Sequence, residues 1–270
     1  MRLDESLEVA ARTDAGRVRS HNEDSIAVEP ACGLMVLADG MGGYNAGEVA
    51  SGIAVSVMMA EMRPVLAGGS GSEDEGRMVS LLDGSVRKAN AAIYQAARSD
   101  EQYAGMGTTV VAALFFDNRV AVAHVGDSRL YRLREGVLEA VTRDHSLLQE
   151  QIDCGMISAE EARHSQNRNL VTRAVGIDAD LDPEIHLHEV RVGDVYLLCS
   201  DGLNDMLEDE DIQSILYAMQ NNLELAAEQL IQSANDNGGK DNVSVILVKV
   251  RQAFALPKKR LTRLFGWFSK

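Results

Sequence analysis

The sequence has 270 residues, of which 46% are hydrophobic and 25% charged, the balance of a soluble globular protein with one large domain or two small ones. Its net charge of −15 is unevenly distributed, because residues 252–270 hold five basic residues and no acidic one, leaving 21 basic against 41 acidic residues elsewhere. A body this acidic repels nucleic acid, so we expect no nucleic-acid partner.

The cysteines and the lengths of the apolar segments indicate the cellular compartment. Cys32, Cys154 and Cys199 are odd in number and widely spaced, which fits neither a disulfide framework nor a zinc site. No signal peptide opens the sequence, and no uninterrupted apolar run reaches the length of a membrane span. We therefore expect a cytoplasmic protein, and a monomer.

The first elements are a strand, a buried strand and two helices. Residues 25–28 predict a short strand directly after Glu23 and Asp24. Residues 34–38 form an unbroken apolar run, typical of a strand buried on both faces, and deliver Asp39 to a glycine-rich segment where we expect a sharp turn. Residues 46–66 are apolar nearly all round, and residues 79–97 carry one apolar stripe at helical spacing.

The second half of the sequence alternates hairpins and helices. Asp117-Asn118 and Glu135-Gly136 are two-residue turns between β-rich runs and predict antiparallel hairpins. Residues 185–190 and 195–200 are predicted to continue the sheet as two strands around a turn at 191–194. A final strand is predicted at 243–250, and helices are predicted at 212–219 and 223–234. This order predicts an α+β fold of antiparallel sheets covered by helix pairs, interrupted by an insertion at 145–170.

Carboxylates gather at the boundaries of the predicted strands. The set comprises Glu23, Asp24, Asp39, Asp127, Asp201, Asp205 and Asp241. Mutual repulsion makes such a cluster costly unless cations neutralise it. Ligands that offer only oxygen favour Mg²⁺ or Mn²⁺ over zinc. With an arginine available for an oxyanion, the pattern predicts metal-assisted attack of water on a phosphate.

Seven short motifs occur in one order along the chain. They are Arg19-x-x-Asn22-Glu23-Asp24, Asp39-Gly40-Met41-Gly42-Gly43, Gly107-Thr108-Thr109, Gly126-Asp127-Ser128-Arg129, Asp144-His145-Ser146, Ser200-Asp201-Gly202-Leu203 and Asp241-Asn242-x-Ser244. Each motif alone is weak, but the ordered set is specific. The chain resembles the bacterial branch of the metal-dependent type 2C (PPM) protein Ser/Thr phosphatases, from about Asp4 to Lys249.

The resemblance implies an αββα sandwich, two antiparallel sheets with helix pairs outside and metals in a cleft at one end. It implies that two Mn²⁺ or Mg²⁺ ions are held by Asp24, Asp39, Asp201, Asp241 and the Gly40 carbonyl, with Glu23 acting through water. Asp127 and Asp205 would hold a third, weaker ion, and Arg19 would bind the substrate phosphate. Arg19, Asp24 and Asp39 are therefore the predicted catalytic residues.

The implied activity is hydrolysis of phosphoserine and phosphothreonine on proteins by a metal-activated water, in a signalling role that reverses a bacterial Ser/Thr kinase. The catalytic domain would span residues 1–251, with 145–170 as a flap beside the cleft. Alternatives are a catalytically dead binding module and a phosphatase specialised for small regulatory phosphoproteins.

Several residues have simpler interpretations. Asp201 could cap a helix, and Asp127 could form an ion pair with Arg129. Met41 stands where many eukaryotic members carry the histidine that protonates the leaving oxygen, and a thioether donates no proton. The general acid is therefore unassigned, with His21 and a metal-bound water as candidates.

Residues 252–270 form a basic tail that the resemblance does not cover. Leu261, Leu264, Phe265 and Phe268 share one face of a predicted helix that begins at Pro257. The tail is too short to span a bilayer but could lie on an anionic membrane surface or contact a partner. The alternatives are docking on the acidic body and disorder.

Overall fold

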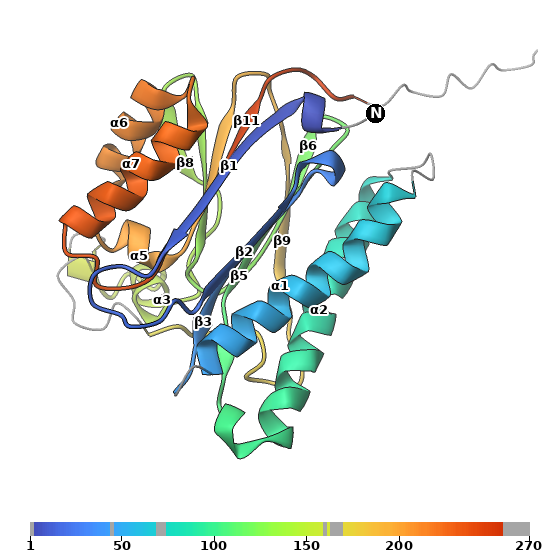
Figure 1. Ribbon diagram of the computed structural model, residues 1–270, viewed down its shortest axis with the longest axis vertical. Helices are drawn as coiled ribbons and strands as arrows, with labels where there is room; N and C mark the ends of the chain where they lie inside the picture. Colours follow the sequence, from blue (N-terminus) through green and yellow to red (C-terminus); the bar gives the residue numbers. More distant parts are fainter. Residues whose placement is uncertain (1–2, 44–45, 69–73, 159–160, 163–169, 256–270) are drawn as a thin grey trace, which may run out of the picture.

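Two antiparallel sheets lie face to face, and helices cover their outer sides (Figure 1). This computed structural model describes residues 3–43, 46–68, 74–158, 161–162 and 170–255. The layers follow the order helices, sheet, sheet, helices. The predicted α+β class and αββα sandwich are confirmed.

One sheet is built mainly from the second half of the chain. Its strand order is β1 (Leu7–Asp14), β11 (Val243–Val250), β10 (Val195–Cys199), β7 (Arg129–Arg134) and β8 (Val137–Ala140). The helices α6 (Asp209–Met219) and α7 (Leu223–Asp236) cover its outer face, and the short α5 (Asp201–Asn204) follows β10 directly.

The other sheet is built mainly from the first half. Its order is β2 (Asp24–Glu29), β3 (Leu34–Met41), β5 (Val110–Phe116), β6 (Arg119–Val125) and β9 (Glu184–Glu189), and β4 (Gly107–Thr108) pairs with the end of β3. The helices α1 (Ala46–Ala67) and α2 (Glu75–Ser99) cover its outer face. Short helical segments are η1 (Leu3–Glu5), η2 (Pro30–Cys32), η3 (Glu101–Tyr103) and α3 (Leu147–Asp153).

Strand alternation separates the apolar core into layers. In β3, Leu34 and Val36 pack toward α1 and α2, whereas Met35 and Leu37 lie between the sheets. A strand buried on both faces reads as a continuous apolar run, which is why this segment was predictable. Phe254, which the sequence assigns to the tail, is buried between the sheets.

Turn chemistry fixes both predicted hairpins. Asp117 and Asn118 have φ of 43° and 54°, the left-handed conformation that a two-residue hairpin turn requires at both positions. Glu135 and Gly136 have φ of 52° and 84°. These turns set the β5–β6 and β7–β8 registers, Phe116 opposite Arg119 and Arg134 opposite Val137.

Three features differ from the sequence predictions. β1 was not predicted, although it pairs with β11 along its whole length. β9 and β10 lie in different sheets, because β9 pairs with β6 and β10 pairs with β7 and β11. The strand does not turn at Gly40 but continues to Met41, where it pairs with β4.

α1 is long and apolar enough, by length and composition alone, to cross a membrane, although Glu48, Glu61 and Arg63 interrupt its apolar run. In this fold it packs on β3 and α2, and Ala50, Ala54 and Met58 are fully buried. The buried part of its apolar surface therefore belongs to the core of the sandwich.

Two predictions fall wholly or partly outside the described residues. Residues 256–270 contain the apolar and basic positions of the predicted tail helix. Residues 159–160 and 163–169 belong to the predicted flap, of which residues 145–158, 161–162 and 170 are described.

Candidate metal centre

The site begins with two aspartates on neighbouring strands. Asp24 opens β2, Asp39 lies in β3, and the two residues are directly opposite each other in the antiparallel pair. Side chains at opposite positions point to the same face with Cβ atoms about 5 Å apart. Like charges placed this way are destabilising, so the pairing calls for a cation.

The two oxygens of the Asp24 carboxylate have different surroundings. Ser200 Oγ and Ser244 Oγ donate to Asp24 Oδ2 at 2.8 and 2.6 Å. Asp24 is only 8% exposed, and its Oδ1 is buried without a hydrogen-bond partner among the residues that the structure describes. A buried acceptor without a partner is costly, and a metal ion is one group that satisfies it.

The other predicted ligands lie at or near the ends of strands in both sheets. Asp201 opens α5 directly after β10, and Asp127 follows β6 at the turn made by Gly126. The Asp205 amide donates to the Asp201 carbonyl at 2.8 Å, one helical turn later. Asp241 precedes β11 and lies in the loop that leads into it.

A close backbone approach connects β3 to the first turn of α1. A Cβ atom on Gly40 would lie 2.0 Å from the Gly47 carbonyl oxygen, and one on Gly47 would lie 2.8 Å from the Gly40 carbonyl. The Gly40 amide donates to the Glu23 carbonyl at 3.1 Å, and Ser51 Oγ donates to the same carbonyl at 2.6 Å. Two glycines are therefore needed for the main chain to pass this close to the acidic cluster.

Burial and mutual repulsion raise the pKa of the clustered carboxyls. Burial raises the pKa of Asp24 to about 6, partly opposed by its serine hydrogen bonds. Burial and the neighbouring Asp24 and Asp201 raise the pKa of Asp39 well above its ordinary value. Burial and then Asp144 raise the pKa of Asp127 to about 6. Burial and then Asp127 raise that of Asp201 well above its ordinary value.

A cleft of about 260 Å³ opens over these carboxylates. It is lined by Arg19, Glu23, Asp39, Gly40, Met41, Gly42, Thr109, Asp127, Val171, Asp201 and Asp241. Arg19 Nη2 donates to Asp241 Oδ2 at 2.6 Å, and half of the Arg19 side chain is exposed. The guanidinium is thus at the cleft, anchored on one edge by a predicted ligand and accessible on the other.

The donor set fits hard divalent cations. Every predicted ligand offers oxygen, the preference of Mg²⁺ and Mn²⁺, and the acids outnumber the one nearby arginine. The orphaned Asp24 Oδ1 and the raised pKa values indicate a cluster whose charge requires neutralisation.

The simpler interpretations of two aspartates do not match the geometry. Arg129 forms a bidentate pair with Asp144, at 2.8 and 2.7 Å, rather than with Asp127. The N-cap of α5 is Ser200, and Asp201 lies inside the first turn.

Sequence reasoning missed the polar residues that support the acids. Thr109 Oγ1 accepts from the Asp39 amide at 3.1 Å. Asn242 Oδ1 accepts from the Glu23 amide at 2.8 Å, and its Nδ2 donates to the His21 carbonyl at 2.8 Å. Ser200, Ser244, Thr109 and Asn242 all stand inside the quoted motifs, which was the one signal available.

Met41, at the position of the family's proton-donating histidine, and His21, the candidate side chain for a general acid, are placed differently. Met41 lines the cleft, whereas His21 is exposed and is not among the lining residues. The structure thus leaves the proton donor without an assigned side chain.

Comparison with known proteins gives the family. The model of the family described as protein phosphatase 2C matches residues 14–235. The chain belongs to the protein phosphatase 2C family. The resemblance carried by the seven motifs is thereby confirmed.

Relatives and solved structures agree with this membership. The serine/threonine protein phosphatase PstP of Mycobacterium tuberculosis is 41% identical over 244 residues, which cover 90% of this chain. The serine/threonine phosphatase Stp of Listeria monocytogenes is 37% identical, over 88% of this chain and 94% of Stp. The catalytic domain of PstP in complex with two manganese ions superposes with a TM-score of 0.81 at 38% identity, covering 92% of this chain and 99% of that domain.

The extent of these matches differs. The chain spans 45% of the length of PstP. It spans nearly the whole of Stp and of the PstP catalytic domain.

Proposed function

We propose that this protein is a Mn²⁺- or Mg²⁺-dependent protein phosphatase that hydrolyses phosphoserine and phosphothreonine on proteins. The observation that carries the proposal is the Asp24–Asp39 pair, two carboxylates directly opposite on adjacent strands. One of them keeps a buried oxygen that no described residue hydrogen-bonds. Family membership and the names of the relatives support the same activity.

Asp24, Asp39, Asp201, Asp241 and the Gly40 carbonyl would hold two ions, and Asp127 with Asp205 would hold a weaker third. The bound ions would lower the pKa of a water molecule to make it a nucleophile and neutralise charge that develops on the phosphate. Ser200 and Ser244 orient Asp24, and Thr109 fixes the Asp39 backbone, so the ligands are pre-positioned.

Arg19 would bind the substrate phosphate through its planar guanidinium. Its ion pair with Asp241 keeps the side chain at the edge of the cleft, and its exposed half faces solvent. Val171, from the segment after the flap, lines the same cleft and would restrict access of bulky peptides.

The biological setting is part of the same proposal. Its substrates would be phosphorylated proteins, a Ser/Thr kinase would act in opposition, and the protein would work in signalling as a cytoplasmic monomer. Three free cysteines, including the fully buried Cys199, support a reducing compartment. The basic tail would add a weak contact with a membrane surface or partner.

Hydrolysis of p-nitrophenyl phosphate and a phosphothreonine peptide tests the proposal. We expect turnover with Mn²⁺, loss with EDTA, and a decrease of at least about 100-fold in Asp39→Asn and Asp201→Asn, since an amide lacks the charge the ions need. Asp180→Asn, an exposed aspartate, serves as the control. Undiminished hydrolysis in both variants would refute the mechanism, and wild-type Mn²⁺ binding without turnover would favour a catalytically dead binding module.

A further inference from the structure

His145 lies against the turn that carries Asp127. It is only 7% exposed, and its amide donates to the Gly126 carbonyl at 2.9 Å. In return the Gly126 amide donates to His145 Nδ1 at 3.2 Å. Two hydrogen bonds therefore join His145 to Gly126, the residue that precedes Asp127.

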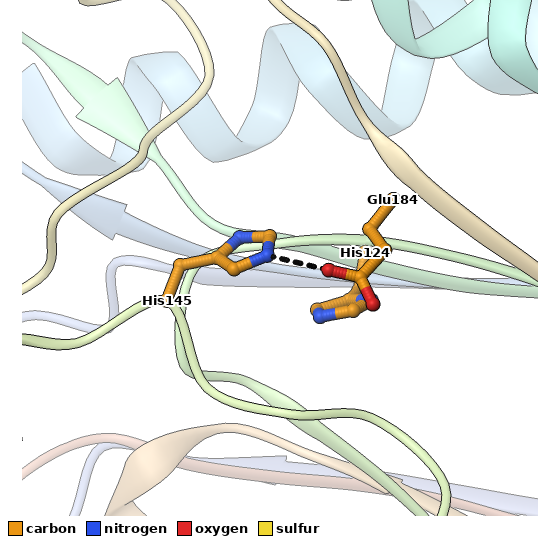
Figure 2. Close-up of side chains that lie close together, drawn as sticks. All are labelled: His124, His145 and Glu184. Atoms are coloured by element: carbon orange, nitrogen blue, oxygen red, sulfur yellow. Dashed lines mark hydrogen bonds and ion pairs between the residues drawn. The ribbon is translucent and has the colours of Figure 1, made fainter. Parts of the chain in front are cut away.

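The accepting role of Nδ1 fixes the protonation of the ring. A neutral imidazole has one N–H, so a ring that accepts at Nδ1 carries its proton at Nε2. His145 Nε2 lies 3.2 Å from Glu184 Oε2 and donates to it (Figure 2). Burial raises the pKa of Glu184, but hydrogen bonds from His186 and His145 outweigh it and lower the pKa to about 2, so the acceptor is a carboxylate.

The same side chains could be read as a metal site. His124, His145 and Glu184 each offer an atom within 4.8 Å of the others (Figure 2). His124 donates from Nε2 to the Arg143 carbonyl at 2.9 Å, which leaves its buried Nδ1 with a free lone pair. However, an ion on His145 Nε2 needs the lone pair of a nitrogen that already carries the proton. The hydrogen-bond pattern therefore favours a metal-free chain of hydrogen bonds from the Gly126 amide through His145 to Glu184, the His145 relay.

Gly126 needs an external support of this kind. Its φ of 104° is open to glycine and rarely to other residues, and a Cβ atom would lie 2.6 Å from Thr109 Cγ2. The same freedom gives the unfolded glycine many conformations, so the turn is ordered by its contacts. His145 supplies such a contact, because it hydrogen-bonds both the amide and the carbonyl of Gly126.

His145, the first residue of the predicted flap, is also hydrogen-bonded to the segment that follows the flap. Its carbonyl accepts from the Thr172 amide at 2.8 Å, and the Leu147 amide donates to the Leu170 carbonyl at 2.9 Å. Val171, between these two contacts, lines the cleft. One residue thus joins the Asp127 turn to a wall of the active site.

We propose that His145, oriented by Glu184, is a positioning residue that holds the Gly126–Asp127 turn in the geometry needed for the weakest of the three divalent ions. The inference rests on the proposed function, which makes Asp127 a ligand of that ion. Groups that orient metal ligands typically contribute about 10- to 100-fold to metal affinity.

Nitrogen-15 NMR of the histidine rings tests the tautomer independently of catalysis. We expect His145 to show an unprotonated Nδ1 and a protonated Nε2 in the metal-free protein at pH 7.5. One equivalent of Zn²⁺ should leave that pattern unchanged. A protonated Nδ1, or Zn²⁺ bound at Nε2 in wild type and lost in His124→Ala, would overturn the relay.

Two substitutions separate the halves of the relay. His145→Asn retains an acceptor at the position of Nδ1, whereas His145→Gln retains a donor near Nε2 and loses that acceptor. Calorimetric Mn²⁺ titration should give near-normal affinity for the weakest ion in His145→Asn and about tenfold weaker affinity in His145→Gln. The two tighter ions should bind normally in both.

The control is His186→Ala, which removes the other histidine on Glu184. It should bind all ions like wild type. Equal affinity of the weakest ion in wild type and His145→Gln, or its equal loss in both His145 variants, would refute the positioning role. A wild-type protein that binds no Mn²⁺ would instead contradict the proposed function, and the NMR result would then decide the relay alone.

Discussion

The Asp24 carboxylate accepts two hydrogen bonds, yet its burial makes its negative charge unfavourable. Two serine hydroxyls stabilise the charge at Oδ2 by hydrogen bonding, but burial still raises the pKa of Asp24 to about 6. A carboxyl whose folded pKa lies above its unfolded value of about 3.9 binds more protons in the folded state. In the absence of metal this group therefore destabilises the fold at neutral pH, and the cost is relieved as the pH falls from about 6 to about 4.

Replacing Asp24 with asparagine should reverse its effect on stability between metal-free and metal-bound protein. Without metal at pH 7.5, Asp24→Asn should be more stable by up to about 3 kcal/mol, because about two pKa units of unfavourable charge are removed at about 1.4 kcal/mol each. With saturating Mn²⁺ it should be less stable, since the ion loses a charged ligand. Urea unfolding with EDTA or Mn²⁺ measures both, with Asp180→Asn as the control. The same order of stability in both conditions would contradict the assignment.

Arg19 should contribute to phosphate binding more than to the metal centre. Arg19→Ala should raise KM for p-nitrophenyl phosphate about tenfold and lower kcat less, because a charged hydrogen bond to phosphate is lost. Arg19→Lys should restore only part of the phosphate binding, because lysine lacks the planar guanidinium that makes two parallel hydrogen bonds. Arg17→Ala is the matched control, because Arg17 lines a different pocket. An unchanged KM in Arg19→Ala, or Mn²⁺ affinity that falls together with kcat, would assign Arg19 a structural role.

The acids could be predicted residue by residue, whereas their supports could not. Asp39 and Asp201 follow apolar runs that the sequence displays directly. Ser244 reaches Asp24 across 220 positions of chain, and Asn242 reaches the Glu23 amide across 219. A hydroxyl or amide in a short motif does not reveal which distant group it will meet, because that depends on the pairing of whole strands.

At the scale of elements, the contact between β3 and α1 depends on two missing side chains. Gly47→Ala should destabilise the protein by about 2 kcal/mol, since its Cβ would enter the Gly40 backbone and overpacking outweighs the gain in helix propensity. Gly52→Ala, five residues later in α1, meets open space and should stabilise by about 0.5–1 kcal/mol. Urea unfolding with EDTA compares them, and equal stability of both variants would show that the close approach is relaxed at no cost.

Elements defined by local signals were predictable, and their assembly was not. The two hairpins follow from turns whose residues accept positive φ. β1 was missed because Arg12, Thr13 and Asp14 follow its apolar positions, and it is stabilised by pairing with β11 at the other end of the chain. β9 and β10 are separated by few residues but join different sheets, a choice made by long-range pairing.

At the scale of the whole molecule, the acidic body and the basic tail carry opposite charge. The body ends later than the sequence suggests, because Phe254 is buried and its amide donates to Asn118 Oδ1 at 2.6 Å. Arg251 also pairs with Glu8. A shortened chain that ends at Ala255 therefore keeps these contacts and removes all five basic residues of the tail.

The full-length chain should bind anionic vesicles weakly and with strong dependence on salt, and the chain ending at Ala255 should not. Lys258, Lys259, Arg260, Arg263 and Lys270 lie beyond the cut, and each basic residue near an anionic surface contributes about 1 kcal/mol. Co-sedimentation with phosphatidylserine vesicles at low salt and at about 0.5 M salt measures the difference, since salt screens the attraction. Replacing the first three of these residues with glutamine controls for charge. Equally low binding by both chains would leave docking on the acidic body or disorder as the account of the tail.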